Sequence, residues 1–218
     1  MKLRITALFA LIAVLAGCAV PGAPRYSDEQ DAQLRGSAPA SSVTLKHTQT
    51  VGVIFTQNTV ASLAYMERYN AAVRTGVVAS LTDSRITDAY VNSSDPQLAI
   101  NGFAESLEKQ FASVAFYENL DAVLAARPDV IVLLDTRNKL ITERSSDVQA
   151  SISAEFFDSD FKFIGKAEGS DAKSMSPIWA HTKRAPQIAA QINEQRNVQV
   201  NALQKFDASL QALIKAQS

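Results

Sequence analysis

Residues 130–134 read VIVLL, the most apolar run in the part of the chain that we expect to fold. The run shows no alternation of polar and apolar residues, which is typical of a central strand covered on both faces. Residues 148–156 alternate between apolar and mostly polar side chains, and residues 161–164 do so more weakly. Asp158-Ser159-Asp160 lies between these two runs, so we expect an antiparallel hairpin there.

The chain beyond the hairpin predicts one long helix. Pro186 opens a helical stretch of about residues 186–216, in which residues 191–199 are largely polar. The apolar stripe of this helix consists of Val200, Leu203, Phe206, Leu210 and Leu213. This stripe has two interpretations: it docks on the domain, or it is offered to another chain as a coiled coil or a groove-binding helix.

The chain before residue 130 predicts further strands and helices. Residues 51–55 and 114–116 indicate strands, residues 85–91 a further strand, and residues 119–126 a short helix. A longer helix is predicted by the helical spacing of Leu63, Met66, Val73 and Val77, with Asn70 as the polar residue on that line. Asp95-Pro96 is a helix start, followed by a stripe of Ile100, Phe103, Leu107 and Phe111. The predicted fold class is therefore α/β (α+β): one mixed-sheet domain over residues 46–218, flanked by helices.

The first residues have the features of a secretory signal peptide. Lys2 and Arg4 are followed by an apolar stretch over residues 5–15, and then by small residues. The apolar run ends before Pro21 and is shorter than the roughly 20 residues that a membrane-spanning helix needs. Leu15-Ala16-Gly17-Cys18 resembles the lipobox of bacterial lipoproteins. That resemblance implies that residues 1–17 are removed, that the Cys18 thiol receives a diacylglycerol, and that its amine gains a further acyl chain.

The predicted lipid on Cys18 would anchor the chain to a membrane. Several buried acyl chains, at about 0.8 kcal/mol per CH₂, give stable anchoring. Ala19 follows the cysteine, and in lipoproteins of enterobacterial type the absence of aspartate there favours the outer membrane, on its periplasmic side. The alternative is an ordinary secreted protein whose single cysteine lies near the cleavage site by chance. Residues 18–45 are rich in Pro, Gly, Ala and Ser and predict a flexible tether.

The charge of the mature chain excludes some partners. Removing residues 1–17 takes Lys2 and Arg4 away and leaves a formal charge of −3. Such a chain has no overall basic footprint for nucleic acid, and its net charge predicts no attraction to anionic membranes beyond the lipid.

Few side chains in this sequence indicate a metal site or a catalytic site. His47 and His181 lie far apart, and no other cysteine accompanies them, so we expect no metal site and no cofactor. Asp158-x-Asp160 begins like a calcium loop, but Lys162 stands where the next oxygen ligand belongs, so a hairpin turn is the better interpretation. We therefore expect no enzyme. Trp179 lies in a polar loop, where it either covers the core or anchors a partner.

The order of the predicted elements supports a second resemblance. Residues 51–55 with their helix, residues 111–135 and the hairpin over residues 148–169 resemble periplasmic lipoproteins related to the curli-secretion lipoprotein, the lipoprotein activators of penicillin-binding proteins and the N-terminal domain of TolB. The hairpin lacks the Thr-Gly turn common in that group. The resemblance implies a scaffold or accessory role in envelope assembly or secretion, through another envelope protein or through self-association. The alternatives are a small-ligand-binding lipoprotein, which predicts a deep apolar pocket, and a periplasmic hydrolase, which predicts perturbed carboxylates in a cleft.

Overall fold

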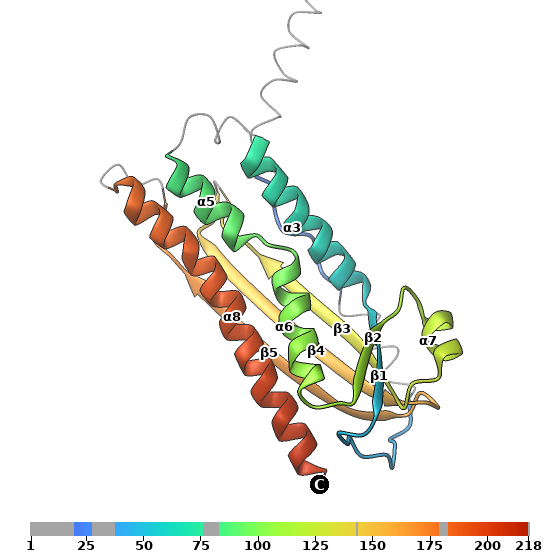
Figure 1. Cartoon of the computed structure of the whole chain (residues 1–218). Helices are drawn as coiled ribbons and strands as arrows, with labels where there is room; N and C mark the ends of the chain where they lie inside the picture. The colour runs from blue at the N-terminus through green and yellow to red at the C-terminus, as the bar shows by residue number, and fades with distance from the viewer. Residues whose placement is uncertain (1–19, 28–37, 76–82, 143, 179–182, 218) are drawn as a thin grey trace, which may run out of the picture.

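A five-stranded mixed sheet forms the centre of the computed structural model, which describes residues 20–27, 38–75, 83–142, 144–178 and 183–217 (Figure 1). The strand order is β2-β1-β3-β4-β5, with β1 parallel to both β2 and β3 and with β3, β4 and β5 antiparallel in turn. In chain order the elements are β1 (Thr50–Phe55), α3 (Gln57–Thr75), α5 (Ser84–Ser93), α6 (Gln97–Glu108), β2 (Ser113–Phe116), α7 (Leu120–Ala126), β3 (Val130–Lys139), β4 (Asp147–Asp158), β5 (Phe163–Ser174) and α8 (Ala185–Ala216). The predicted fold class is confirmed.

The central position predicted for residues 130–134 is also confirmed. On one face of β3, Val130, Val132 and Leu134 belong to a core cluster that includes residues of α6 and α8. On the other face, Ile131 and Leu133 pack with residues of α7 and β4. An uninterrupted apolar run is required here because both faces of the strand are removed from water.

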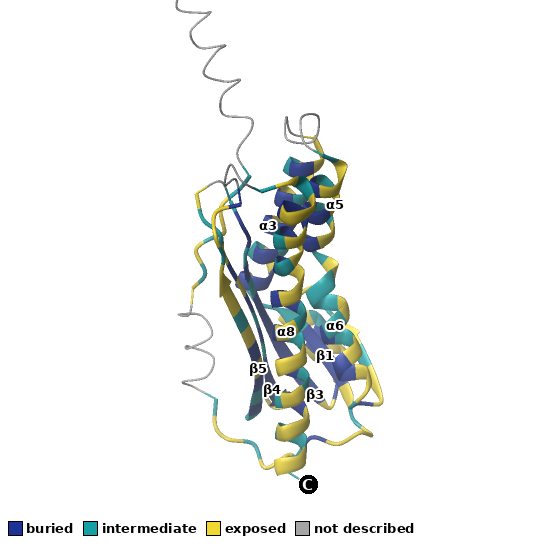
Figure 2. Cartoon of the chain, turned by 90° about the vertical axis from the view of Figure 1, so that its left-hand side faces the viewer, coloured by how far each residue is buried: buried dark blue, intermediate teal, exposed yellow. Residues whose placement is uncertain are grey.

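Four helices, α3, α5, α6 and α8, cover one face of the sheet (Figures 1 and 2). The long helix predicted from Pro186 is confirmed as α8, which has 32 residues and packs along β5 and α5. The polar middle of α8, residues 191–199, also makes contacts with the rest of the domain. The Gln195 side chain accepts a hydrogen bond from the Ile141 amide at 2.7 Å and donates one to Ser93 Oγ at 2.9 Å.

The turn between β4 and β5 is a hairpin turn, as predicted. Asp158 Oδ1 accepts hydrogen bonds from the amides of Asp160 at 3.0 Å and Lys162 at 2.9 Å. The strand after the turn is longer than the sequence indicated, because β5 continues to Ser174 through a run of small and charged residues. Its pairing with β4 along the whole length explains this extension.

The strand predicted over residues 85–91 is wrong, because this segment forms α5. Asp83 caps the helix by accepting a hydrogen bond from the Arg85 amide at 3.1 Å. Ile86, Ala89 and Tyr90 then lie on one buried face at helical spacing. Packing of this face against α8 decides the conformation, which β-branched and aromatic residues alone leave ambiguous.

Parts of the predicted tether, residues 18–45, lie against the domain. The Tyr26 hydroxyl donates a hydrogen bond to the Asn138 carbonyl at 2.8 Å and accepts one from the Asn138 amide at 2.9 Å. Ala40 bridges to Phe163 at the start of β5, and Leu45 is buried. The stretch 20–27 is thus held by side chain–backbone hydrogen bonds and the stretch 38–45 by a backbone bridge and a buried side chain, none of which composition reveals. Within the described residues, no helix combines the length and apolar character needed to cross a membrane.

Candidate functional site

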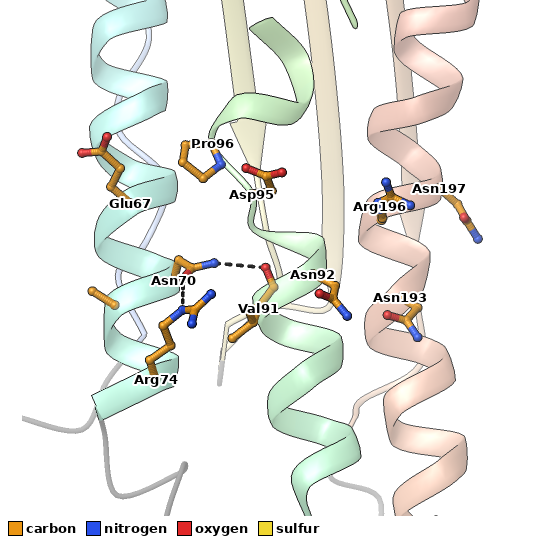
Figure 3. A pocket seen from close by; sticks show the side chains of 11 residues that line it. Glu67, Asn70, Arg74, Val91, Asn92, Asp95, Pro96, Asn193, Arg196 and Asn197 are labelled. Carbon is orange, nitrogen blue, oxygen red and sulfur yellow. Dashed lines mark hydrogen bonds between the residues drawn. The ribbon is translucent and has the colours of Figure 1, made fainter. Parts of the chain in front are cut away.

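A groove of about 900 Å³ crosses the helical layer between α3, the turn joining α5 to α6, and α8 (Figure 3). Its lining is mainly amide and charged side chains. These are Glu67, Asn70, Arg74, Asn92, Asp95, Asn193, Arg196 and Asn197. Three segments distant in sequence therefore contribute to one polar surface.

Asn70 fixes one wall of this groove. Its amide nitrogen donates hydrogen bonds to the Val91 carbonyl and to Ser94 Oγ, each at 3.0 Å. Its amide oxygen accepts a hydrogen bond from Arg74 Nε at 2.6 Å, which orients the guanidinium along the groove (Figure 3). The sequence signal for this role was visible, since Asn70 is the polar residue on an otherwise apolar line of α3.

The opposite wall is held by buried polar contacts from α8. Gln195 and Gln199 donate to the hydroxyl and carbonyl oxygens of Ser93, at 2.9 and 2.8 Å. Ser93 closes α5, and two residues later Asp95 Oδ1 accepts a hydrogen bond from the Gln97 amide at 2.9 Å as α6 begins. The turn carrying Asp95 is therefore fixed against α8 by hydrogen bonds rather than by apolar packing alone.

A second hollow, of about 690 Å³, lies beside the first between α6 and α8. The two hollows share Asp95 and Arg196 in their linings. Leu98, Val200 and Leu203 contribute the apolar part of the second hollow, and Glu105, Lys109 and Asp207 contribute charged side chains. The two adjoining hollows form a surface feature that is polar at the α3 side and amphipathic between α6 and α8. We call it the helical groove.

The helical groove offers hydrogen-bond donors and acceptors of both charge signs. Asparagine side chains carry one carbonyl acceptor and two N–H donors, the same groups that a polypeptide backbone presents. Arginine adds donors in a planar fork that matches carboxylates. Among the described residues, no group of three or more His, Cys, Asp or Glu side chains lies close enough to hold a metal ion.

The structure divides the predicted stripe of α8 into two sets. Val200 and Leu203 are half-buried and line the helical groove. Phe206 and Leu210 are fully buried, with the Phe206 ring 5.4 Å from the Phe103 ring, and half-buried Leu213 packs against the same core cluster. Phe206, Leu210 and Leu213 are thus docked on the domain, as in the first of the two interpretations, whereas the half-buried Val200 and Leu203 leave the second one open. Trp179 and the lipobox residues Leu15, Ala16, Gly17 and Cys18 lie outside the described residues.

The sequence did not single out the charged and amide residues of the helical groove. Asn193, Arg196 and Asn197 occupy positions i, i+3 and i+4 of α8, which places them on one face of the helix. This spacing was present in the polar stretch over residues 191–199. Its importance appears only when α3 and the α5–α6 turn lie beside it.

The sequence matches no family model and no curated protein. Among solved structures, the chain is similar to two crystal forms of a PelC dodecamer from Paraburkholderia phytofirmans, one of them a single-residue variant. Sequence identity is 10% in both cases. The alignments cover 75% of this chain and 95% of the variant with a TM-score of 0.31, and 73% and 94% of the other with a TM-score of 0.29. This is a distant structural likeness, and it carries no argument about function.

Proposed function

We propose that this chain is a lipid-anchored protein of the cell envelope that binds an extended segment of another envelope protein in the helical groove, without chemistry of its own. The observation that carries the proposal is that two neighbouring hollows along α8 share Asp95 and Arg196 in their linings. Neighbouring hollows lined by amide and charged side chains suit a polypeptide backbone, which needs donors and acceptors along its length.

The lipid anchor of this proposal rests on the sequence Leu15-Ala16-Gly17-Cys18. Ala19 favours the periplasmic side of the outer membrane as the location. The resemblance in element order to envelope accessory lipoproteins supports a scaffold role in assembly or secretion. The small-ligand alternative predicted a deep apolar pocket, whereas the groove of about 900 Å³ is lined mainly by charged and amide side chains.

A site-specific crosslink in cells tests the groove. A photoreactive amino acid replaces Asn197 in the groove, and a matched control carries it at Ala208, an exposed position on the same helix outside the groove. We expect one adduct of a single mass from the Asn197 position, and its loss when Arg196→Glu is added. The Ala208 position should give none.

Three results would contradict the proposal. One is no adduct at Asn197, and another is an equal adduct at Ala208. The third is an adduct of twice the chain's own mass, which assigns the groove to a second copy instead of a different protein.

A further inference from the structure

The position of Val20 determines which end of the domain lies near the lipid anchor. Val20 packs on the core cluster that contains Ile86, Ile178 and Ile188, as Met175 and Ala185 also do. Two residues of chain in any conformation span at most about 7 Å, so a lipid attached two positions before Val20 is tethered close to this residue. An acyl chain on Cys18 therefore brings the bilayer to this end, where α3 ends and α5 and α8 begin (Figure 1, upper end). We call it the anchor end.

Basic side chains gather at the anchor end from separate elements. Arg74 comes from the last turn of α3, Arg144 from the β3–β4 connection, and Lys183 and Arg184 from the residues before α8. None of these four has a carboxylate partner within the described residues. Lys183 Nζ donates to Ser176 Oγ at 2.8 Å, to the Pro177 carbonyl at 2.7 Å and to Gln191 Oε1 at 2.5 Å; these groups are neutral, so they use its three donors but leave its charge uncompensated.

Most acidic side chains at the anchor end are already paired. Hydrogen bonds from the Arg85 side chain and amide hold the pKa of Asp83 at about 2, so this pair contributes no net charge. Glu194 pairs with Lys173 at 2.6 Å, and Asp147 with Lys139 at 3.5 Å. Asp88 on α5 remains. The described part of the anchor end is therefore net positive.

The opposite end of the domain lacks this separation of charge. Glu118, Asp121 and Asp129 lie there together with Arg127 and Lys162, so both signs are mixed. The two ends are far apart, since the 32 residues of α8 alone extend about 48 Å. The net charge of −3 predicted no attraction to anionic membranes beyond the lipid. The fold changes that expectation because it concentrates positive charge where the chain reaches the bilayer.

We propose that the anchor end is a membrane-contact surface that rests on anionic lipid headgroups, with exposed Arg144 and Arg184 facing them and with the charges of Arg74 and Lys183 adding to the positive potential of this end. This inference rests on the lipid anchor of the proposed function. Each basic residue near an anionic bilayer strengthens its binding about fivefold. The contact orients the domain, so that its long axis stands away from the bilayer and the helical groove stays accessible from the side.

Energy transfer from the protein to the bilayer tests this orientation. The full acylated chain is reconstituted in vesicles of phosphatidylcholine alone or mixed with phosphatidylglycerol, with a rhodamine-labelled headgroup lipid as acceptor. A dye is attached through Thr75→Cys at the anchor end, or through Ser159→Cys in the β4–β5 turn, and both positions are exposed. The Cys18 sulfur is blocked by its diacylglycerol, so each dye has one attachment site.

We expect transfer from the Thr75 position to be at least about twice as efficient as from Ser159, given an α8 length of about 48 Å. Phosphatidylglycerol should raise the Thr75 signal further, and about 0.5 M salt should remove that rise because the Debye length falls to about 4 Å. The double variant Arg144→Glu and Arg184→Glu should also remove it. The matched control Arg127→Glu and Lys162→Glu, at the opposite end, should retain it.

Equal transfer from both dye positions would overturn the membrane contact, as would a phosphatidylglycerol effect that survives both salt and charge reversal. These results would not contradict the lipid anchor, because the acylated chain still floats with vesicles of phosphatidylcholine alone. A chain that fails to float with those vesicles contradicts the lipid anchor itself, and with it both proposals.

Discussion

Gly169 is a residue of β5 at which the backbone of α8 approaches the sheet closely. A Cβ atom at this position would lie 2.2 Å from the Ala202 carbonyl oxygen and 2.3 Å from the Phe206 amide nitrogen. Both are backbone atoms of α8, so relief requires that the helix and the strand separate. The absence of a side chain here lets fully buried Phe206 enter the core between the sheet and α6.

Gly169→Ala should therefore lower the free energy of unfolding by about 3 kcal/mol or more, because overpacking against backbone has no side chain to move aside. Urea unfolding measures the change. Gly22→Ala is the matched control, since nothing lies within 4 Å of a Cβ atom there, and it should change stability by less than about 0.5 kcal/mol. Equal effects of the two substitutions would contradict this packing.

Tyr65 predicts how stability depends on alkaline pH. Its ring is fully buried, and burial raises the pKa of its hydroxyl from 10.0 to about 12. Below pH 10 both folded and unfolded chains keep the proton. Between about pH 10 and about pH 12 the unfolded chain releases it while the folded chain retains it, so the free energy of unfolding falls as pH rises.

The loss attributable to Tyr65 should reach about 2–3 kcal/mol across that pH window. Urea unfolding of the native chain and of Tyr65→Phe at a series of pH values measures it. Tyr65→Phe should be less stable at neutral pH, because the Leu140 amide loses its acceptor at 3.1 Å, but its stability should fall less steeply above pH 10. The same slope in both proteins would show that another group is responsible.

At the scale of single elements, the polar middle of α8 is as important as its apolar stripe. Gln195 connects α8 to α5 through Ser93 and to the end of β3 through the Ile141 amide. Gln195→Ala leaves that buried amide without an acceptor, and should cost about 2–3 kcal/mol in unfolding free energy. Gln204→Ala, on an exposed face of the same helix, should cost less than about 0.5 kcal/mol. A small effect at both positions would mean that α8 is held by apolar contacts alone.

Elements whose conformation follows from their own residues were predicted from sequence. The run over residues 130–134 identified the central strand, Asp158-Ser159-Asp160 identified the hairpin, and Pro186 the start of the last helix. The segment that became α5 was not predicted, because its β-branched and aromatic residues suit a strand equally well. Its cap at Asp83 and its contact with α8 decide the outcome, and the contact with α8 joins residues about a hundred positions apart.

The tether prediction shows the same limit. A composition rich in Pro, Gly, Ala and Ser predicts flexibility, yet Tyr26 makes a double hydrogen bond with the backbone of Asn138, 112 residues away. No local sequence pattern predicts a hydrogen-bond partner so far away in the chain. The helical groove was unpredictable for the same reason, since its walls come from α3, the α5–α6 turn and α8.

At the scale of the whole molecule, the fold makes the two ends of the domain different from each other. One end carries the start of the described chain and uncompensated basic residues, and the helical groove runs along the side of the domain. A lipid at Cys18 would place the first of these ends at the membrane and so orient the domain. Net charge and composition contain none of this information, because it depends on which residues the fold brings to each end.

The lipid on Cys18 is the central claim, and the mass of the N-terminal peptide tests it most directly. We predict that the protein extracted from membranes begins at Cys18 and carries the mass of a diacylglycerol and one further acyl chain. Cys18→Ser should leave residues 1–17 attached, remove the added mass and change the membrane fractionation of the chain. A mature peptide with an unmodified Cys18 thiol, or one that begins at another residue, would contradict the account.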